Sequence, residues 1–139
     1  MRNVLGVEDA DHEESSPEAP RLAVTLLSCS LVGQDGTVSI RPDSRAAALY
    51  GRLEAVEGYW CNYGVSPEYA DQLDEGGLSV TGRSANGEIR IVELPGHPFF
   101  IATLFLPQLR STPVEPHPLL AGFVAAARAQ RPEIAMTAR

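Results

Sequence analysis

Three side chains have the chemistry of catalysis: Cys61, Glu57 and His97. A thiol is a nucleophile once an electropositive setting makes it a thiolate, and an imidazole is a base near neutral pH. A carboxylate beside aromatic rings is an acid when burial raises its pKa. Each also has a more frequent structural interpretation: Cys61 as a small buried hydrophobe, His97 as part of a turn, and Glu57 as a strand-end charge in water. We therefore keep all three only as catalytic candidates.

Other residues of these types have structural interpretations. Cys29 lies between two serines of an expected strand, which favours a place in the core. His12 has acidic neighbours, but a run of charges is more often a solvated segment than a metal site, and we expect no metal or cofactor. His117 precedes Pro118, where it is expected to serve the start of the last helix.

Aromatic residues suggest an apolar pocket. Two segments carry them, one around residue 60 and one around residue 100. We expect the two to meet around a pocket lined by Tyr59, Trp60, Tyr63, Phe99 and Phe105.

Composition excludes several classes of function. The formal net charge is −7 over 139 residues, and all 11 basic residues are Arg. The absence of Lys excludes a Schiff-base lysine and a P-loop lysine, and the acidic balance argues against nucleic-acid binding. The use of Arg without any Lys also fits a GC-rich, actinobacterial type of genome. No run of about 18 apolar residues or signal peptide is visible, and two Cys make no disulfide framework, so we expect a cytoplasmic protein without a membrane span.

The pattern predicts one domain, 21–131, between an acidic flexible segment, 1–20, and a tail, 132–139. Strands are expected over 22–32, 37–40, 58–63, 78–84, 88–94 and 99–106, with a turn at 34–36. Asn86-Gly87 indicates a hairpin, and the run 99–106 is typical of a strand buried on both faces. Helices are expected from Ser44 to Tyr50, from Ser66 to about Asp74, and over 118–128. The fold class is α+β, with a mainly antiparallel or mixed sheet, a few short helices and a C-terminal helix.

Several segments resemble the glutaminase domain of CTP synthase, a class I glutamine amidotransferase. The run from Leu94 to Gln108 is similar to the family's L-P-x-H-P-F-F-x-A-T-Q-F-H-P-E. Further similar segments are S-R-A-A-A-L-Y-G (44–51), V-S-P-E-Y (65–69) and H-P-L-L-A-G-F-V (117–124). A bacterial group named after the CTP synthase C-terminal region is more similar still, because it shares the segments 2–12, 27–32 and 58–64.

The resemblance also predicts a loss of chemistry. The family's catalytic His and Glu correspond to Leu106 and Gln108, and the Gly-rich elbow with the nucleophilic Cys would precede residue 2. We therefore expect the chain to begin after the elbow. The family's glutamine-holding basic run corresponds to residues 58–64, which contain no cation. The expected fold is the C-terminal half of an α/β amidotransferase domain, without glutaminase activity.

Assembly and function follow from these losses. The run 99–106, with Ile101, Leu104, Phe105 and Leu106, would lose its neighbours on both sides, which predicts a homodimer with this strand, or the helix that covers it, at or near the interface. We expect a catalytically degenerate amidotransferase-like protein that binds a small ligand or a protein partner. One alternative is a small enzyme of specialised metabolism, a cyclase or isomerase that uses the apolar pocket. The other is one half of a split amidotransferase-like complex.

Overall fold

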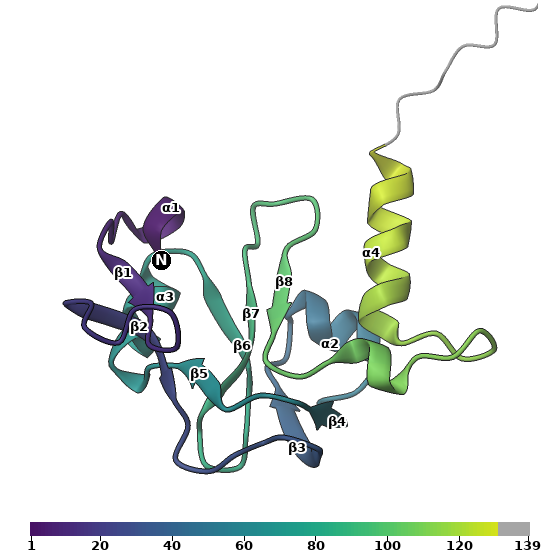
Figure 1. The fold of residues 1–139 in the computed structure, drawn as a ribbon. Coiled ribbons are helices and arrows are strands. Elements are labelled where there is room, and N and C mark those ends of the chain that lie inside the picture. The colour runs from purple at the N-terminus through teal and green to yellow at the C-terminus, as the bar shows by residue number, and fades with distance from the viewer. Residues whose placement is uncertain (131–139) are drawn as a thin grey trace, which may run out of the picture.

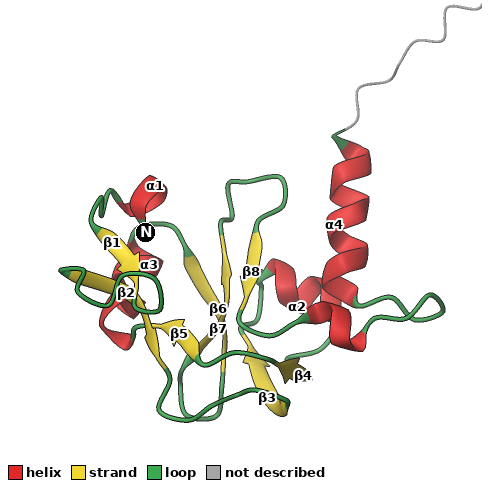
Figure 2. Ribbon diagram, viewed as in Figure 1, coloured by secondary structure: helices red, strands yellow, loops and turns green. Residues whose placement is uncertain are grey.

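The computed structural model describes residues 1–130, which form two sheets with helices on their outer sides (Figures 1 and 2). The predicted tail, 132–139, lies outside the described residues. The smaller sheet has the order β1-β2-β5 and consists of β1 (Ala10–His12), β2 (Arg21–Leu26) and β5 (Tyr63–Val65). The larger sheet has the order β4-β3-β6-β7-β8. Its strands are β3 (Gln34–Ile40), β4 (Glu54–Tyr59), β6 (Ser79–Arg83), β7 (Ile89–Glu93) and β8 (Ile101–Thr103).

The helices are short except for the last. They are α1 (Arg2–Leu5), α2 (Arg45–Tyr50), α3 (Ala70–Glu75) and α4 (Pro118–Ala129), with 3-10 turns η1 (Pro67–Tyr69) and η2 (Pro107–Arg110). Only β1 and β2 pair in parallel, and every other strand pair is antiparallel. The predicted α+β class with a mainly antiparallel, mixed sheet is therefore confirmed. No helix among residues 1–130 is long and apolar enough to cross a membrane.

The helix starts and the hairpin that local sequence signals predicted are present in the structure. Ser44 caps α2 by accepting a hydrogen bond from the Ala47 N–H at 3.0 Å. The Asn86-Gly87 hairpin joins β6 to β7, and α4 begins at Pro118, as predicted. Gly82 sits at a bulge in β6, where a Cβ atom would lie 2.5 Å from Ile91 Cγ1. Only glycine allows the two strands to approach this closely.

Long-range pairing differs from the predictions. The turn expected at 34–36 is the start of β3, which pairs with β4 and β6 rather than with β2. The strand expected over 58–63 is divided, because β4 ends at Tyr59 and β5 begins at Tyr63, in the other sheet. Within the segment 1–20, expected to be flexible, β1 pairs with β2. A strand of three residues has too few positions to show a periodic pattern.

Two apolar clusters lie on the larger sheet. One holds Val38, Ile91, Phe105 and Leu119 with their neighbours, and the other holds Leu73, Leu78, Val80 and Ile89 beneath α3. Phe105 is only 1% exposed, so the chain itself covers a residue that was expected to be bare. The run 99–106 does not form a central strand, since β8 has three residues and lies at the sheet edge.

Helix α4 projects from the body of the molecule (Figure 1). Of its residues only Leu119 is buried, and Leu120, Phe123 and Val124 are exposed. The basis for the predicted homodimer therefore moves from the strand to this helix, and the homodimer stays a prediction.

A buried carboxylate fixes the start of α2. Glu93 accepts hydrogen bonds from the N–H groups of Arg45 and Ala46 and from the Thr81 hydroxyl, at 3.0, 2.9 and 2.8 Å. A carboxylate at this end of a helix satisfies otherwise unpaired N–H groups. The Arg45 side chain in turn donates to the carbonyls of His97 and Pro98, which holds the 94–99 turn beside α2.

Candidate functional site

Of the five aromatic residues predicted to line one pocket, only Tyr59 and Phe105 pack against each other. Tyr59 and Phe105 pack edge to face in the core, with ring centroids 6.1 Å apart. Trp60 is 64% exposed, Tyr63 packs on His12, and Phe99 packs on Phe123 of α4. Strand β4 ends at Tyr59, so Trp60 and Tyr63, which follow it, lie on other surfaces of the molecule. The predicted apolar pocket was wrong.

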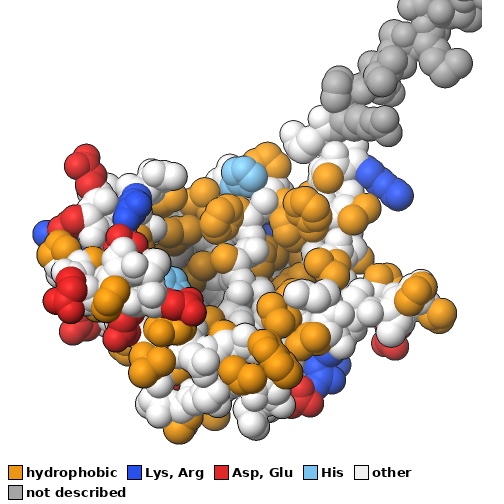
Figure 3. Space-filling view, in the orientation of Figure 1, with side chains coloured by type: hydrophobic (Ala, Val, Ile, Leu, Met, Phe, Trp, Pro, Cys, Tyr) orange, Lys and Arg blue, Asp and Glu red, His pale blue; other side chains and the backbone are white. Residues whose placement is uncertain are grey.

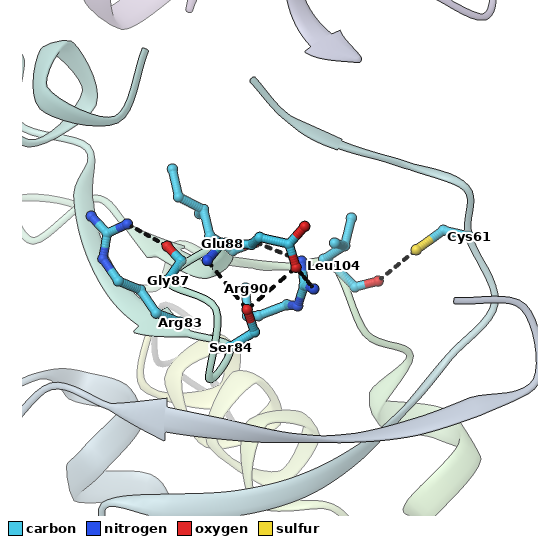
Figure 4. Close-up of polar contacts among 8 residues, drawn as sticks. Cys61, Arg83, Ser84, Gly87, Glu88, Arg90 and Leu104 are labelled. Atoms are coloured by element: carbon cyan, nitrogen blue, oxygen red, sulfur yellow. Dashed lines mark hydrogen bonds and ion pairs between the residues drawn. The ribbon is translucent and has the colours of Figure 1, made fainter. Parts of the chain in front are cut away.

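Cys61 is an unactivated thiol in the structure. It is half-buried against the main core cluster and donates to the Leu104 carbonyl at 3.6 Å (Figure 4). Burial raises the pKa of the Cys61 thiol, which lowers the thiolate fraction at neutral pH. Cys29 is exposed, so its predicted place in the core was wrong. Neither thiol has an imidazole among its hydrogen-bond partners in residues 1–130.

The remaining histidines make local contacts. His97 is exposed, and its Nδ1 accepts from the Phe99 N–H at 3.2 Å, inside the turn. The Nδ1 atom of His12 accepts from the Glu14 N–H at 3.1 Å. Residues 1–130 contain no group of three His, Cys, Asp or Glu side chains arranged to hold a metal ion.

Leu106 and Gln108 lie where the chain turns from β8 into η2. The Leu106 N–H donates to the Gly58 carbonyl at 2.9 Å, which places this residue beside the end of β4. The Leu106 side chain is half-buried, and Gln108 is exposed. An aliphatic chain and a neutral amide at these positions supply neither a proton acceptor of suitable pKa nor a negative charge.

Glu57 belongs to a buried cluster that the sequence analysis did not find, and its Oε2 atom is buried without a hydrogen-bond partner. Its Oε1 accepts from the Tyr50 hydroxyl at 2.6 Å and from His117 Nε2 at 3.0 Å. His117 Nδ1 accepts from the Leu119 N–H, which assigns the ring proton to Nε2. Glu57 and His117 are 2% and 3% exposed. Burial and the neighbouring Glu57 carboxylate raise the pKa of Tyr50.

One sequence signal pointed to this cluster. Side chains alternate along β4, so Glu57 shares the inward face with Ala55 and Tyr59. A carboxylate between two inward apolar positions needs buried partners. The expected role of His117 at the start of the last helix is present too, because its side chain caps α4.

A second polar cluster surrounds Arg90 (Figure 4), and its Glu88 side chain is part exposed. The Arg90 side chain is 4% exposed, yet Arg90 is among the lining residues of two hollows of about 430 and 300 Å³. Its Nη2 donates to Glu88 Oε2 at 2.5 Å, and its Nη1 donates to the Ile89 carbonyl at 3.4 Å. Glu88 also accepts a long hydrogen bond from the Ser84 hydroxyl at 3.3 Å.

Tyr59 forms the floor of this cluster. The Arg90 guanidinium lies 5.4 Å from the centre of the Tyr59 ring. The Tyr59 hydroxyl is buried and has no hydrogen-bond partner. Burial raises the pKa of Tyr59 to about 12, although the positive charge of Arg90 acts in the opposite direction. Sequence reasoning missed Arg90, because a single Arg in a strand of five residues carries no motif.

Comparison with known proteins gives a consistent result. No family model matches the chain. The CTP synthase of Sulfurisphaera tokodaii is 37% identical over 135 residues, which cover 91% of this chain and 25% of the relative. The CTP synthase of Thermococcus kodakarensis is 38% identical over 141 residues, covering 94% and 26%. The structure of the Trypanosoma brucei CTPS glutaminase domain with bound acivicin superposes with a TM-score of 0.85 at 29% identity. The superposition covers 94% of this chain and 55% of that one.

The chain is homologous to the glutaminase domain of CTP synthase. The predicted relationship to class I glutamine amidotransferases is thereby confirmed, and so is the expected similarity of fold. This CTP synthase-related domain spans about a quarter of the length of the curated relatives that it matches.

Proposed function

We propose that this CTP synthase-related domain is a catalytically degenerate amidotransferase-like protein that binds a small ligand and does not hydrolyse glutamine. The observation that carries the proposal is the pair Leu106 and Gln108, at the positions that resemble the family's base and carboxylate. In cysteine-dependent acyl transfer the base deprotonates the thiol and the carboxylate orients the base. A leucine and a glutamine do neither.

The environment of Cys61 supports the same proposal. Its thiol donates to a backbone carbonyl, and its raised pKa keeps it protonated near neutral pH. Cys61 therefore does not take over the role of the nucleophile.

The test is ammonia release from glutamine by the purified chain, with the Trypanosoma brucei glutaminase domain as the positive control. We expect no release above a no-protein control. We also expect none from the double variant Leu106→His with Gln108→Glu, because both cysteines lack an activated environment. Ammonia release that Cys61→Ala abolishes contradicts the proposal.

Of the alternatives, the enzyme with an aromatic pocket loses support, because Tyr59 and Phe105 are buried in the core while the other three lining residues lie on other surfaces. The homodimer keeps support from the exposed Leu120, Phe123 and Val124 on α4, since burying such side chains is worth about 1.5–3 kcal/mol each. We expect light scattering to give a dimer for the wild type and a monomer for Phe123→Asp. A stable heteromeric complex with a second chain, in place of the dimer, favours the split complex instead. A folded wild-type monomer contradicts the homodimer.

A further inference from the structure

The Arg90 cluster has donor capacity that its own contacts do not use. A guanidinium carries five N–H groups, two of them on each Nη atom. The two hydrogen bonds of Arg90 use one N–H on each Nη, and the bond to the Ile89 carbonyl is long, at 3.4 Å. A cation whose side chain is 96% buried requires compensation by an anion.

The Tyr59 hydroxyl is a second unused donor, on the ring that the Arg90 guanidinium covers. It is buried without a hydrogen-bond partner, on a residue that lines the 300 Å³ hollow. Buried hydroxyls in native proteins are nearly always paired, so this one indicates a missing acceptor. A guanidinium and a phenol beside one another match the two oxygens of a carboxylate.

Glu88 already occupies part of this position. Its carboxylate reaches Arg90 from the tip of the β6–β7 hairpin, and its side chain is 30% exposed (Figure 4). Because it lies at the solvent-facing side of the cluster, it is able to turn outward when another carboxylate arrives. The chain itself thus demonstrates that Arg90 accepts a carboxylate partner. The charge of Glu88 also disfavours a dianion such as phosphate.

The walls of the hollows indicate the rest of the ligand. The two hollows share Leu27, Ser28, Asn86, Glu88 and Arg90. The larger one continues between β5 and the hairpin along the apolar side chains Leu26, Val65, Ala70 and Ile89. Figure 3 shows the molecule hollowed and lined with hydrophobic side chains between its acidic N-terminal side and the larger sheet. A volume of about 430 Å³ suits a small organic molecule.

We propose that the Arg90 cleft binds a small organic carboxylate with an apolar body, its carboxylate on Arg90 and the Tyr59 hydroxyl. The inference rests on the proposed function, since it names the class of ligand that the domain binds. The apolar body lies along Leu27 and Ile89, and Glu88 is displaced toward solvent.

The test uses hexanoate as the probe and hexanamide as its neutral match. Titrations of the full chain are followed by ¹H–¹⁵N NMR, including the Arg90 side-chain N–H signals. Hexanoate is expected to shift the signals of Arg90, Ile89 and Leu27 in a saturable way, and hexanamide is not. Glu88→Gln removes the competing carboxylate and is expected to tighten hexanoate binding about tenfold.

Two further variants locate the carboxylate. Arg90→Met is expected to abolish the saturable shifts, and Tyr59→Phe to weaken binding severalfold. Arg110→Met removes the same charge on another surface and is expected to leave binding unchanged. If Arg90→Met does not fold, Glu88→Gln still decides, because a purely structural ion pair would give no gain in affinity.

Three outcomes overturn the inference: no saturable shift with hexanoate, equal shifts with hexanamide, or stronger perturbation of Arg90 by inorganic phosphate. These failures are distinct from failure of the proposed function, because ammonia release from glutamine is measured separately. A chain that neither hydrolyses glutamine nor binds hexanoate retains the first proposal and loses the second.

Discussion

The Glu57 cluster and the Arg90 cleft both bury a charged side chain, but they treat it differently. Glu57 Oε1 accepts hydrogen bonds from Tyr50 of α2 and from His117, which caps α4. Arg90 has one carboxylate partner, which is part exposed, and an aromatic ring beneath it. The first arrangement joins α2, β4 and α4 into one unit. Each cluster contains one buried oxygen without a partner, Glu57 Oε2 and the Tyr59 hydroxyl, but Arg90 also keeps N–H groups that its two hydrogen bonds do not use. The difference separates a charge that holds the fold together from a charge available to a ligand.

The largest effect is expected from His117→Ala, which removes one of the two partners of Glu57 and the cap of α4 together. Breaking a buried pair on one side and losing the cap should together cost about 3 kcal/mol of the free energy of unfolding. Urea denaturation followed by circular dichroism measures it. His117→Asn keeps a capping side chain and is expected to recover about 1 kcal/mol of that loss. Equal losses for the two variants would mean that the cap contributes nothing.

Arg90→Met is expected to cost only about 1 kcal/mol in the same measurement. Methionine preserves the packing over Tyr59, and the part-exposed Glu88 is free to turn into water. Glu88→Gln is the matched control and should change the free energy of unfolding by less than Arg90→Met. If Arg90→Met destabilised the chain as much as His117→Ala, the cleft would be structural and the comparison would fail.

The sequence predicted features that depend on neighbouring residues, and it did not predict contacts between residues far apart in the chain. The Ser44 cap, the Asn86-Gly87 hairpin and the Pro118 helix start were predicted because each signal lies within a few residues of the structure it specifies. The Glu57–His117 contact joins residues 60 positions apart, and no local pattern encodes it. The division of the predicted strand 58–63 between two sheets is likewise decided by partners elsewhere in the chain.

Both clusters contain a tyrosine whose pKa is raised by burial, so alkaline pH should weaken both. Burial raises the pKa of Tyr59 from its ordinary 10.0 to about 12, so the folded state binds more protons between these two pH values. Stability is therefore fully present below pH 10 and falls as pH rises from 10 to 12. Tyr59→Phe and Tyr50→Phe should each make the loss less steep in pH-dependent thermal unfolding. A wild-type melting temperature that stays constant from pH 9 to 11.5 would contradict this.

The smallest expected effect concerns the two thiols. Cys29 is exposed, whereas Cys61 is half-buried near the Arg90 cleft and has a pKa raised by burial. Iodoacetamide at pH 7.5 should therefore alkylate Cys29 first, which time-resolved peptide mass spectrometry would detect. Denatured protein is the control, in which the two rates should converge. Faster alkylation of Cys61 in the folded chain would indicate an activated thiol and would reopen the question of a nucleophile.

The contact of Glu93 with the start of α2 has a consequence for the order of folding. Helix α2 has six residues, too few to be stable alone, and its first N–H groups depend on a carboxylate 47 and 48 positions later in the chain. The helix is therefore expected to consolidate only after the β6–β7 hairpin has formed and delivered Glu93. In kinetic terms, substitutions within α2 should mainly accelerate unfolding, while substitutions in the hairpin should slow folding.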